Sequence, residues 1–184
     1  LINMVGLVVY HTDSGYSLGC GLCNKKALDR IRKIRQLDKY HNMTLVCRDL
    51  SDIGTYAKVS NRVFRILKAF TPGAYTFILP ATSEVPRLML NPKRKTLGLR
   101  IPDKAITLAL LEELDEPIMS TTLILPENNF PLSEPEAIHD LLGNQVDLMI
   151  DGGNCGHEPT TVIDLTDELP IVIRVGKGDP TPFE

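Results

Sequence analysis

The chain has 184 residues, 43% of them hydrophobic, and a net charge of −3, a composition typical of a globular protein rather than a disordered one. Its apolar runs fall short of the roughly 18 residues that span a bilayer. No basic segment precedes an apolar stretch at the start, so neither a membrane anchor nor a signal peptide is expected. Four cysteines are too few for a disulfide framework, and a reducing cytoplasm is the expected location. The first residue is Leu1 rather than Met, so a start upstream of this residue is expected.

The small net charge conceals a strong asymmetry along the chain. Residues 1–104 contain 18 Lys and Arg against 7 Asp and Glu, a net +11, whereas residues 105–184 contain 2 against 16, a net −14. A basic field of this size attracts phosphates and nucleic acids. The alternative is that the acidic part simply folds against the basic part.

Strands and helices are predicted to alternate through the basic part. Asn24 is the expected N-cap of a helix over 25–34, and Ser60 that of a second helix ended by Pro72 and Gly73. Their expected inner stripes are Ala27, Leu28, Ile31 and Ile34 in the first helix, and Val63, Phe64, Ile66, Leu67 and Phe70 in the second. Strands are predicted over 5–10, 43–47, 75–79 and 96–101.

The acidic part is predicted to continue the same mixture. Asp103 is the expected cap of a helix that buries Ile106, Leu110 and Leu114, and Ser133 with Glu136 fits a capping box. Strands are predicted over 117–125, 148–150, 161–165 and 171–175, with a tight turn over 151–154 between two of them. The chain is therefore expected to be one α/β domain over 1–184, with a twisted mixed sheet flanked by helices.

Several common motifs are absent from the sequence. Neither the P-loop nor the G-x-G-x-x-G fingerprint occurs, and the zinc-protease and serine-hydrolase signatures are missing too. Cys20 and Cys23 form a C-x-x-C pair without a second pair to complete a zinc site, so buried free thiols are the favoured interpretation and no metal site is assigned. Lys33 and Arg35, at the end of the first helix, could both reach one anion if the chain leaves the helix there. The alternative is a solvated basic helix face.

The segment 8–16, VVYHTDSGY, is an apolar strand that stops at small polar residues, and on its own it indicates only a strand-to-loop junction. In order with later segments it resembles the YrdC family, closest to its YciO branch. The other matching segments are KIR at 33–35, TPGAYTFIL at 71–79, GLRIP at 98–102, MSTTLIL at 119–125, DGG at 151–153, PTTVIDL at 159–165 and IRVGKG at 173–178. The 8–16 segment is therefore expected to form one lip of a binding cavity.

The resemblance implies a large basic cavity and binding of ATP, with Mg²⁺, or of an acyl adenylate such as threonylcarbamoyl-AMP, the intermediate of tRNA threonylcarbamoyladenosine modification. By motif, Lys33, Arg35, Thr122 and Arg174 would bind nucleotide phosphates, and Thr12, Arg100 and Thr160 would line the substrate end. Enzymatic turnover, as a synthase-like nucleotidyltransferase or an adenylate hydrolase, is one interpretation. The alternative is a tRNA- or double-stranded RNA-binding protein without synthase activity. Its expected RNA surface comprises Lys25, Lys26, Arg32, Lys93, Arg94 and Lys95.

Three positions depart from the family pattern. His11 replaces a proline, Thr122 replaces a serine, and Ile124 replaces the asparagine of the synthases. A buried asparagine contact contributes on the order of 1–3 kcal/mol, and isoleucine can neither donate nor accept a hydrogen bond. This substitution argues against an exact copy of the synthase site, but not against nucleotide or RNA binding.

Overall fold

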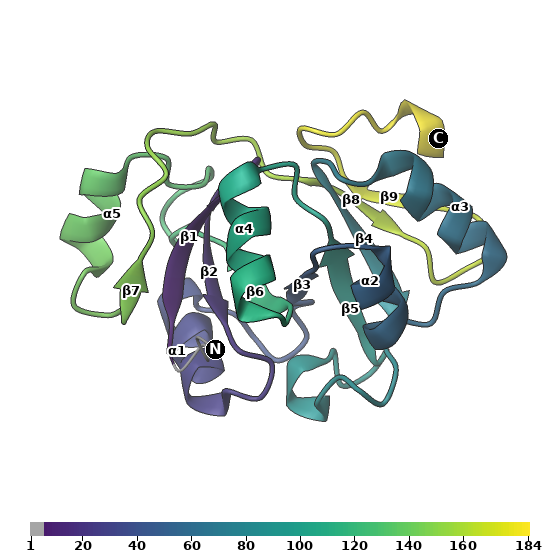
Figure 1. Cartoon of the computed structure of the whole chain (residues 1–184), viewed down its shortest axis with the longest axis horizontal. Helices are drawn as coiled ribbons and strands as arrows, with labels where there is room; N and C mark the ends of the chain where they lie inside the picture. Colours follow the sequence, from purple (N-terminus) through teal and green to yellow (C-terminus); the bar gives the residue numbers. More distant parts are fainter. Residues whose placement is uncertain (1–5) are drawn as a thin grey trace.

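The computed structural model describes residues 6–184 and is built on a nine-stranded mixed sheet (Figure 1). The strands are β1 (Val8–Thr12), β2 (Gly15–Cys20), β3 (Thr44–Val46), β4 (Tyr75–Pro80), β5 (Thr96–Arg100), β6 (Ile118–Thr122), β7 (Leu148–Met149), β8 (Thr161–Asp164) and β9 (Ile171–Arg174). Their order across the sheet is β7-β1-β2-β6-β3-β5-β4-β8-β9. Both parallel and antiparallel pairs occur, so the predicted α/β class with a mixed sheet is confirmed.

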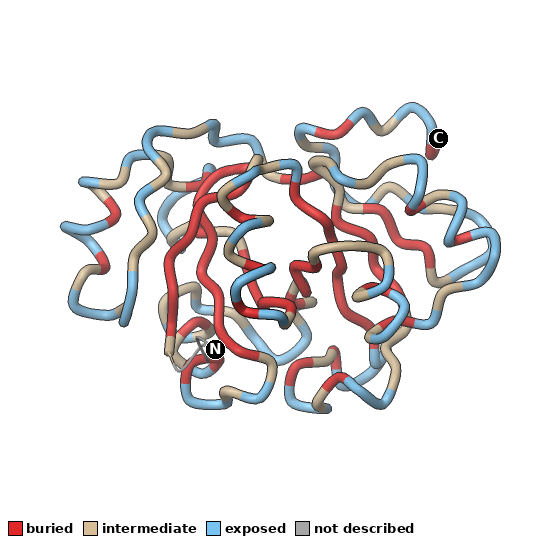
Figure 2. Tube along the Cα trace, in the orientation of Figure 1, coloured by how far each residue is buried: buried red, intermediate tan, exposed pale blue. Residues whose placement is uncertain are grey.

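Five α-helices and two short 3-10 helices accompany the sheet in the described residues. The α-helices are α1 (Lys25–Arg35), α2 (Leu50–Tyr56), α3 (Asn61–Phe70), α4 (Ala105–Leu114) and α5 (Pro135–Leu142), and the 3-10 helices are η1 (Arg87–Met89) and η2 (Thr181–Phe183). Figure 1 shows α4 lying across β1 and β2, α3 beside β8 and β9, and α5 next to β7. The buried backbone follows the central strands (Figure 2), where Leu18, Leu45 and Phe77 are fully buried.

Two of the predicted helix starts are confirmed by their capping contacts. The Asn24 side chain accepts a hydrogen bond from the backbone N–H of Ala27, and Ser60 accepts one from Val63. Each of these bonds satisfies a donor that the first helical turn leaves unpaired. The helix α1 runs one residue further than expected and ends where Gln36 adopts a left-handed conformation with φ 52°. Arg35 therefore belongs to the last helical turn.

The predicted starts of the last two helices are wrong. Asp103 does not cap α4, which follows Lys104 without a side-chain cap; the backbone N–H of Asp103 instead donates to Asp13. The capping box at Ser133 and Glu136 does not form, because α5 begins one residue later, with Pro135 in its first turn. Proline suits that position because its missing N–H would have no helical partner there.

Two of the predicted apolar faces also need correction. In α4 the buried residues are Thr107, Leu111 and Leu114, whereas Ile106 and Leu110 are only partly buried. Thr107 Oγ1 donates to the carbonyl of His11 on β1, and this contact turns the helix by one position. In α3, Val63 and Leu67 are buried, but Phe64 is 45% exposed and lies outside the core.

All eight predicted strands are confirmed, with ends that differ from the predicted ones by at most three residues. The expected strand over 5–10 corresponds to β1, which ends two residues later than predicted, at Thr12. Val5 lies outside the described residues. β2 and α2 were not predicted at all. The tight turn expected over 151–154 does not join neighbouring strands, because β7 pairs with β1 whereas β8 pairs with β4, across the sheet. The last two predicted strands, β8 and β9, form an antiparallel pair.

Among residues 6–184, no helix combines the length and the apolar character needed to cross a membrane.

The two apolar residues Leu67 and Phe64 of α3 provide a matched test of this core. Leu67→Ala is expected to lower the free energy of unfolding by about 2–5 kcal/mol, because it removes a fully buried side chain and leaves a cavity. Phe64→Ala is expected to cost at most about 1.5 kcal/mol, since its ring is half exposed. Urea unfolding of both variants measures the difference, and equal losses would contradict the assigned face of α3.

Candidate functional site

One face of the sheet carries small polar side chains because alternate residues of a strand share a face. Ser17 of β2 lies opposite Thr122 of β6, and Thr44 of β3 lies opposite Gly98 of β5. The intervening residues, such as Leu45, point to the core. The same strands thus build an apolar core on one side and a polar floor on the other.

This polar floor belongs to a cavity of about 210 Å³. Six of the seven predicted phosphate- and substrate-binding residues line it, and Lys33 does not. The lining residues are Thr12, Ser17, Arg35, His41, Asn42, Thr44, Val46, Thr76, Ile78, Gly98, Arg100, Ser120, Thr121, Thr122, Ile124, Thr160, Val162, Ile173 and Arg174. The lining residues come from eight strands, one helix and three connecting segments. The structure therefore brings together residues that are up to 162 positions apart in the chain (Thr12 to Arg174).

The turn between β1 and β2 forms one lip of the cavity. Thr12 Oγ1 donates to the carbonyl of Gly15 at 2.7 Å and accepts from the backbone N–H of Ser14 at 3.2 Å. Gly15 has φ +113°, a conformation that other residues rarely adopt, and a side chain there would also press on Pro131. The segment is both a strand end and a cavity wall, as the sequence indicated.

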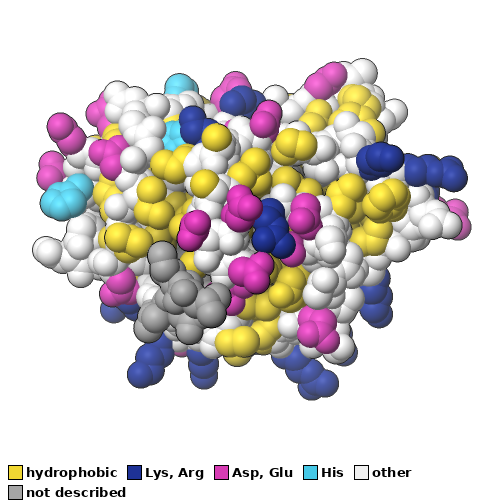
Figure 3. Space-filling model, in the orientation of Figure 1, with side chains coloured by type: hydrophobic (Ala, Val, Ile, Leu, Met, Phe, Trp, Pro, Cys, Tyr) yellow, Lys and Arg dark blue, Asp and Glu magenta, His cyan; other side chains and the backbone are white. Residues whose placement is uncertain are grey.

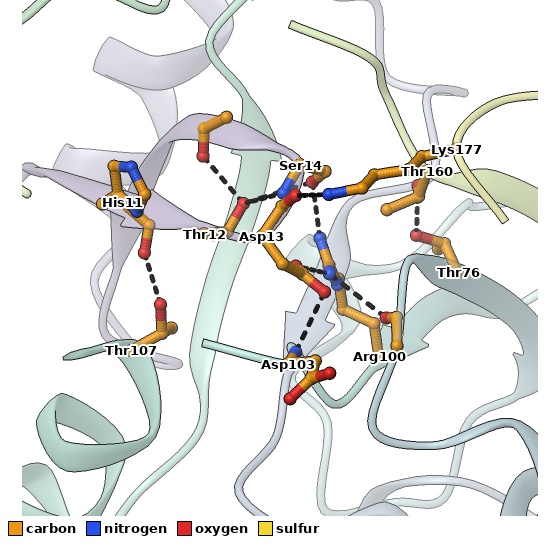
Figure 4. Close-up of polar contacts among 12 residues, drawn as sticks. His11, Thr12, Asp13, Ser14, Thr76, Arg100, Asp103, Thr107, Thr160 and Lys177 are labelled. Atoms are coloured by element: carbon orange, nitrogen blue, oxygen red, sulfur yellow. Dashed lines mark hydrogen bonds and ion pairs between the residues drawn. The ribbon is translucent and has the colours of Figure 1, made fainter. Parts of the chain in front are cut away.

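Arg100 is held inside this lip by an ion pair with Asp13 (Figure 4). Its guanidinium also donates to Ser14 Oγ at 2.8 Å and to the carbonyl of Gly73 at 3.3 Å. The second Asp13 oxygen accepts from the backbone of Asp103 at 2.9 Å. With Arg100 only 4% exposed, its charge is compensated within the protein, so this arginine is mainly a fixed part of the wall.

Arg35 reaches the cavity from the last turn of α1. It donates to Thr121 Oγ1 at 2.7 Å and to the carbonyl of Thr122 at 2.5 Å, while its Nε is buried without a partner. Burial first, and then the charge of Arg174, lower the pKa of Arg35 to about 10. It remains charged at neutral pH, and its hydrogen-bond partners are neutral oxygens that leave this charge uncompensated.

Arg174 approaches from β9, at the other side of the cavity. It donates through Nε and a terminal nitrogen to the carbonyl of Thr160, at 3.1 and 2.8 Å, and to Thr160 Oγ1 at 3.2 Å. Thr160 Oγ1 in turn shares a hydrogen bond of 2.8 Å with Thr76 Oγ1. Burial lowers the pKa of Arg174. Neither Arg174 nor Arg35 forms an ion pair with a carboxylate of residues 6–184.

Sequence reasoning missed the residues that belong to unpredicted segments or to polar strand faces. His41 and Asn42 lie in the connection between α1 and β3, while Ser17 and Ser120 face the cavity from β2 and β6. The alternation of hydroxyl and apolar residues in strands such as 118–122 was the available signal. Nothing in the sequence marked His41, because its place depends on how the loop folds back.

The remaining predicted residues lie elsewhere. Lys33 is exposed on α1 and outside the cavity lining. In the expected RNA surface, Lys25, Lys26, Lys93 and Lys95 are exposed. Two other members, Arg32 and Arg94, are already engaged, the first donating to the carbonyl of Leu88 and the second pairing with Asp164. In Figure 3, Lys and Arg side chains project from the lower edge of the molecule, where Figure 1 places α1 and the segment before β5.

The cysteines are separate free thiols: Cys20 and Cys47 are buried, and Cys23 is exposed. In the part of the chain that the structure describes, no three His, Cys, Asp or Glu side chains are grouped to hold a metal ion. His11 is buried on β1 with neither ring nitrogen hydrogen-bonded, and burial lowers its pKa, as does the charge of Lys104.

Comparisons with known proteins agree on one family. The Sua5/YciO/YrdC family model, described as telomere recombination, matches residues 1–176. YciO of Escherichia coli strain K12, whose name states that it is uncharacterized, is 55% identical over 183 residues, which cover 100% of this chain and 89% of that protein. Its crystal structure has a TM-score of 0.94 at 56% identity and covers 97% of this chain and 87% of that one.

More distant relatives have named activities. The threonylcarbamoyl-AMP synthase of Vibrio vulnificus is 27% identical over 171 residues, which cover 88% of each protein. The crystal structure of Pyrococcus abyssi Sua5 complexed with L-threonine has a TM-score of 0.84 at 25% identity, covering 93% of this chain and 50% of that one.

The ion pair between Asp13 and Arg100 is expected to stabilise the cavity wall strongly. Asp13→Ala should lower the free energy of unfolding by about 3–5 kcal/mol, because it leaves the Arg100 charge buried without a partner. Asp103→Ala removes the same charge from an exposed neighbour that contributes only its backbone N–H, and should change stability by no more than about 0.5 kcal/mol. Denaturant unfolding compares them; similar values would mean that the pair does not hold the lip.

Proposed function

The chain belongs to the Sua5/YciO/YrdC family, and from that premise we propose that its cavity binds ATP or an acyl adenylate such as threonylcarbamoyl-AMP and turns it over. The relatives named as threonylcarbamoyl-AMP synthases support the ligand class, and the threonine bound to Pyrococcus abyssi Sua5 supports an amino-acid component. The proposal covers synthesis or breakdown of the adenylate.

The presence of two arginines without acidic partners in one cavity carries this proposal. Arg35 is partly buried, Arg174 lies exposed on β9 at the cavity wall, and the charge of Arg174 lowers the pKa of Arg35. Like charges held together in a partly dehydrated site are unfavourable unless an anion lies between them. A phosphate supplies that anion, and the planar guanidinium groups can bind its oxygens in pairs.

The hydroxyl groups of the floor suit the remaining parts of such a ligand. Thr122 lies beside Arg35, whose guanidinium donates to the Thr122 carbonyl, and is assigned to the phosphate end. Thr12 lies on the Arg100 side, since both residues contact Ser14 Oγ, whereas Thr160 lies against Arg174. A carboxylate or acyl group would bind between these two threonines. The cavity volume is about 210 Å³, whereas sites for drug-sized ligands typically measure about 300–1,000 Å³. The rest of a nucleotide would therefore lie at the cavity mouth.

Transfer of an adenylyl group depends on positioning and on neutralising phosphate charge more than on covalent help from the protein. Arg35 and Arg174 would position the phosphates and neutralise their charge. Arg100, already paired with Asp13, would hold the cavity wall in place. Mg²⁺ would enter with the triphosphate and share its charge, since no acidic cluster among residues 6–184 is grouped to hold the ion by itself.

Calorimetric titration of ATP, with and without L-threonine, tests this proposal. Arg35→Ala is expected to weaken ATP binding about 10- to 150-fold, because it removes a charge-assisted hydrogen bond. Arg174→Ala is expected to have a similar effect. Lys26→Ala removes the same charge from an exposed site on α1 and should leave affinity within about twofold. Lys33 is also exposed, so Lys33→Ala should weaken ATP binding less than Arg35→Ala does. Absence of ATP binding to the wild type, or equal affinity in Arg35→Ala, would refute the proposal.

A second candidate function, RNA binding without adenylate turnover, is favoured by the exposed lysines along α1 and the segment before β5. Phosphate contacts make such binding weaken linearly on a log–log plot against salt. Replacing Lys25 and Lys26 together by Ala should reduce that slope for tRNA by about 2, whereas Lys68→Ala on α3 should leave it unchanged. Undetectable tRNA binding at low salt, or an unchanged slope in the double variant, would eliminate this candidate.

A further inference from the structure

The connection between α1 and β3 holds His41 firmly at the cavity. The Asp38 carboxylate accepts from the backbone N–H groups of Tyr40 and His41, at 2.8 and 3.1 Å. The Tyr40 carbonyl accepts from Asn91 Nδ2 at 2.8 Å, and Asn42 Oδ1 accepts from Thr96 Oγ1 at 3.2 Å. Bonds on both sides of His41 therefore fix its backbone, and the residue lines the cavity with Arg35 and Arg174.

The charged groups around His41 are mostly cationic. Arg32 and Arg35 face it from α1 and Arg174 from β9, while Asp38 in its own loop is the opposing acid. Burial, followed by the charge of Arg35, lowers the pKa of His41, and Asp38 only partly offsets this. The imidazole is therefore neutral at pH 7, with one ring nitrogen as donor and one as acceptor. Neither nitrogen is hydrogen-bonded to any group of residues 6–184.

We propose that His41 is a third ligand-contacting residue of the anion site, which donates a hydrogen bond to the anion held by Arg35 and Arg174 and takes up a proton when that anion binds. This inference rests on the anionic character of the proposed ligand, but not on its being an adenylate. It assigns to the loop before β3 a role that none of the segments resembling the family indicated.

The sign of the pH dependence follows from the charges. A bound anion offsets the positive charges of Arg32, Arg35 and Arg174 and so raises the His41 pKa above its value in the free protein. Between the two pKa values the complex holds more protons than the free protein, and binding therefore tightens as pH falls. Because the free-protein pKa lies below 6.5, the effect should develop below pH 7.

Inorganic sulfate is the probe of choice, since it carries two negative charges and does not titrate between pH 5.5 and 7.5. Wild-type affinity for sulfate should rise about three- to tenfold over this range as pH is lowered. Calorimetry in two buffers of different ionisation enthalpy should show proton uptake at pH 6. His41→Gln, which keeps a donor but cannot titrate, should bind sulfate with a flat pH profile and no proton uptake.

The exposed histidine of α5 provides the control: His139→Gln should retain the wild-type profile. Thermal unfolding verifies the fold of each variant, and His41→Asn repeats the test if His41→Gln unfolds. Persistence of the wild-type slope in both His41 variants, or no sulfate binding to the wild type, would overturn the inference. A failure of the adenylate proposal gives a different result. ATP would not bind, but sulfate would still bind the wild type more tightly at low pH, and His41→Gln would still show a flat pH profile.

Discussion

The period-two alternation of the central strands is the constraint on which both the core and the cavity depend. Apolar residues such as Leu45 point to the core on one side of the sheet, and residues such as Thr44 point to the cavity on the other. A register slip of one residue would exchange the two faces in any strand. Gly98 shows how tight this arrangement is, because a side chain there would meet Thr76 at 2.8 Å and Thr44 at 3.0 Å. The space above the floor thus requires a glycine in the middle of a strand.

The three cavity arginines differ in the way that their charges are balanced. Arg100 is paired with Asp13 and hydrogen-bonded on two further sides, so its contribution is stability of the wall. Arg35 and Arg174 are bound only by neutral hydroxyl and carbonyl oxygens, which accept hydrogen bonds without neutralising charge. The folded state therefore carries an electrostatic cost that an anionic ligand would relieve, and a ligand that binds only the folded state adds to its stability. This contrast separates the structural arginine from the two that the proposed function assigns to ligand binding.

Local signals in the sequence were sufficient where a single side chain decides the structure, and insufficient where packing decides it. Asn24 and Ser60 were recognised because each cap satisfies its own helix. The face of α4 was not, because the bond from Thr107 to a carbonyl of β1 sets its rotation. β2 is rich in glycine and serine, which hides a strand that is buried on both faces. Six cavity residues followed from the order of motifs. The position of His41 depends instead on a local bond to Asp38 and on the bond from Asn91 to the neighbouring Tyr40 carbonyl, which joins distant segments.

Ile124 shows how the anion site and the rest of the cavity can diverge. Its backbone N–H donates to the carbonyl of Thr122, the same carbonyl that accepts from Arg35, whereas its side chain is apolar. With Ile78, Val162 and Ile173 also in the lining, part of the wall cannot hydrogen-bond to a ligand. A buried polar ligand group facing such a side chain would be left unpaired, at a cost of about 1–3 kcal/mol. Under the proposed function, the arginines would bind the phosphate and this apolar wall would face the group attached to it, so binding of an adenylate would not by itself require the synthase's choice of acyl group.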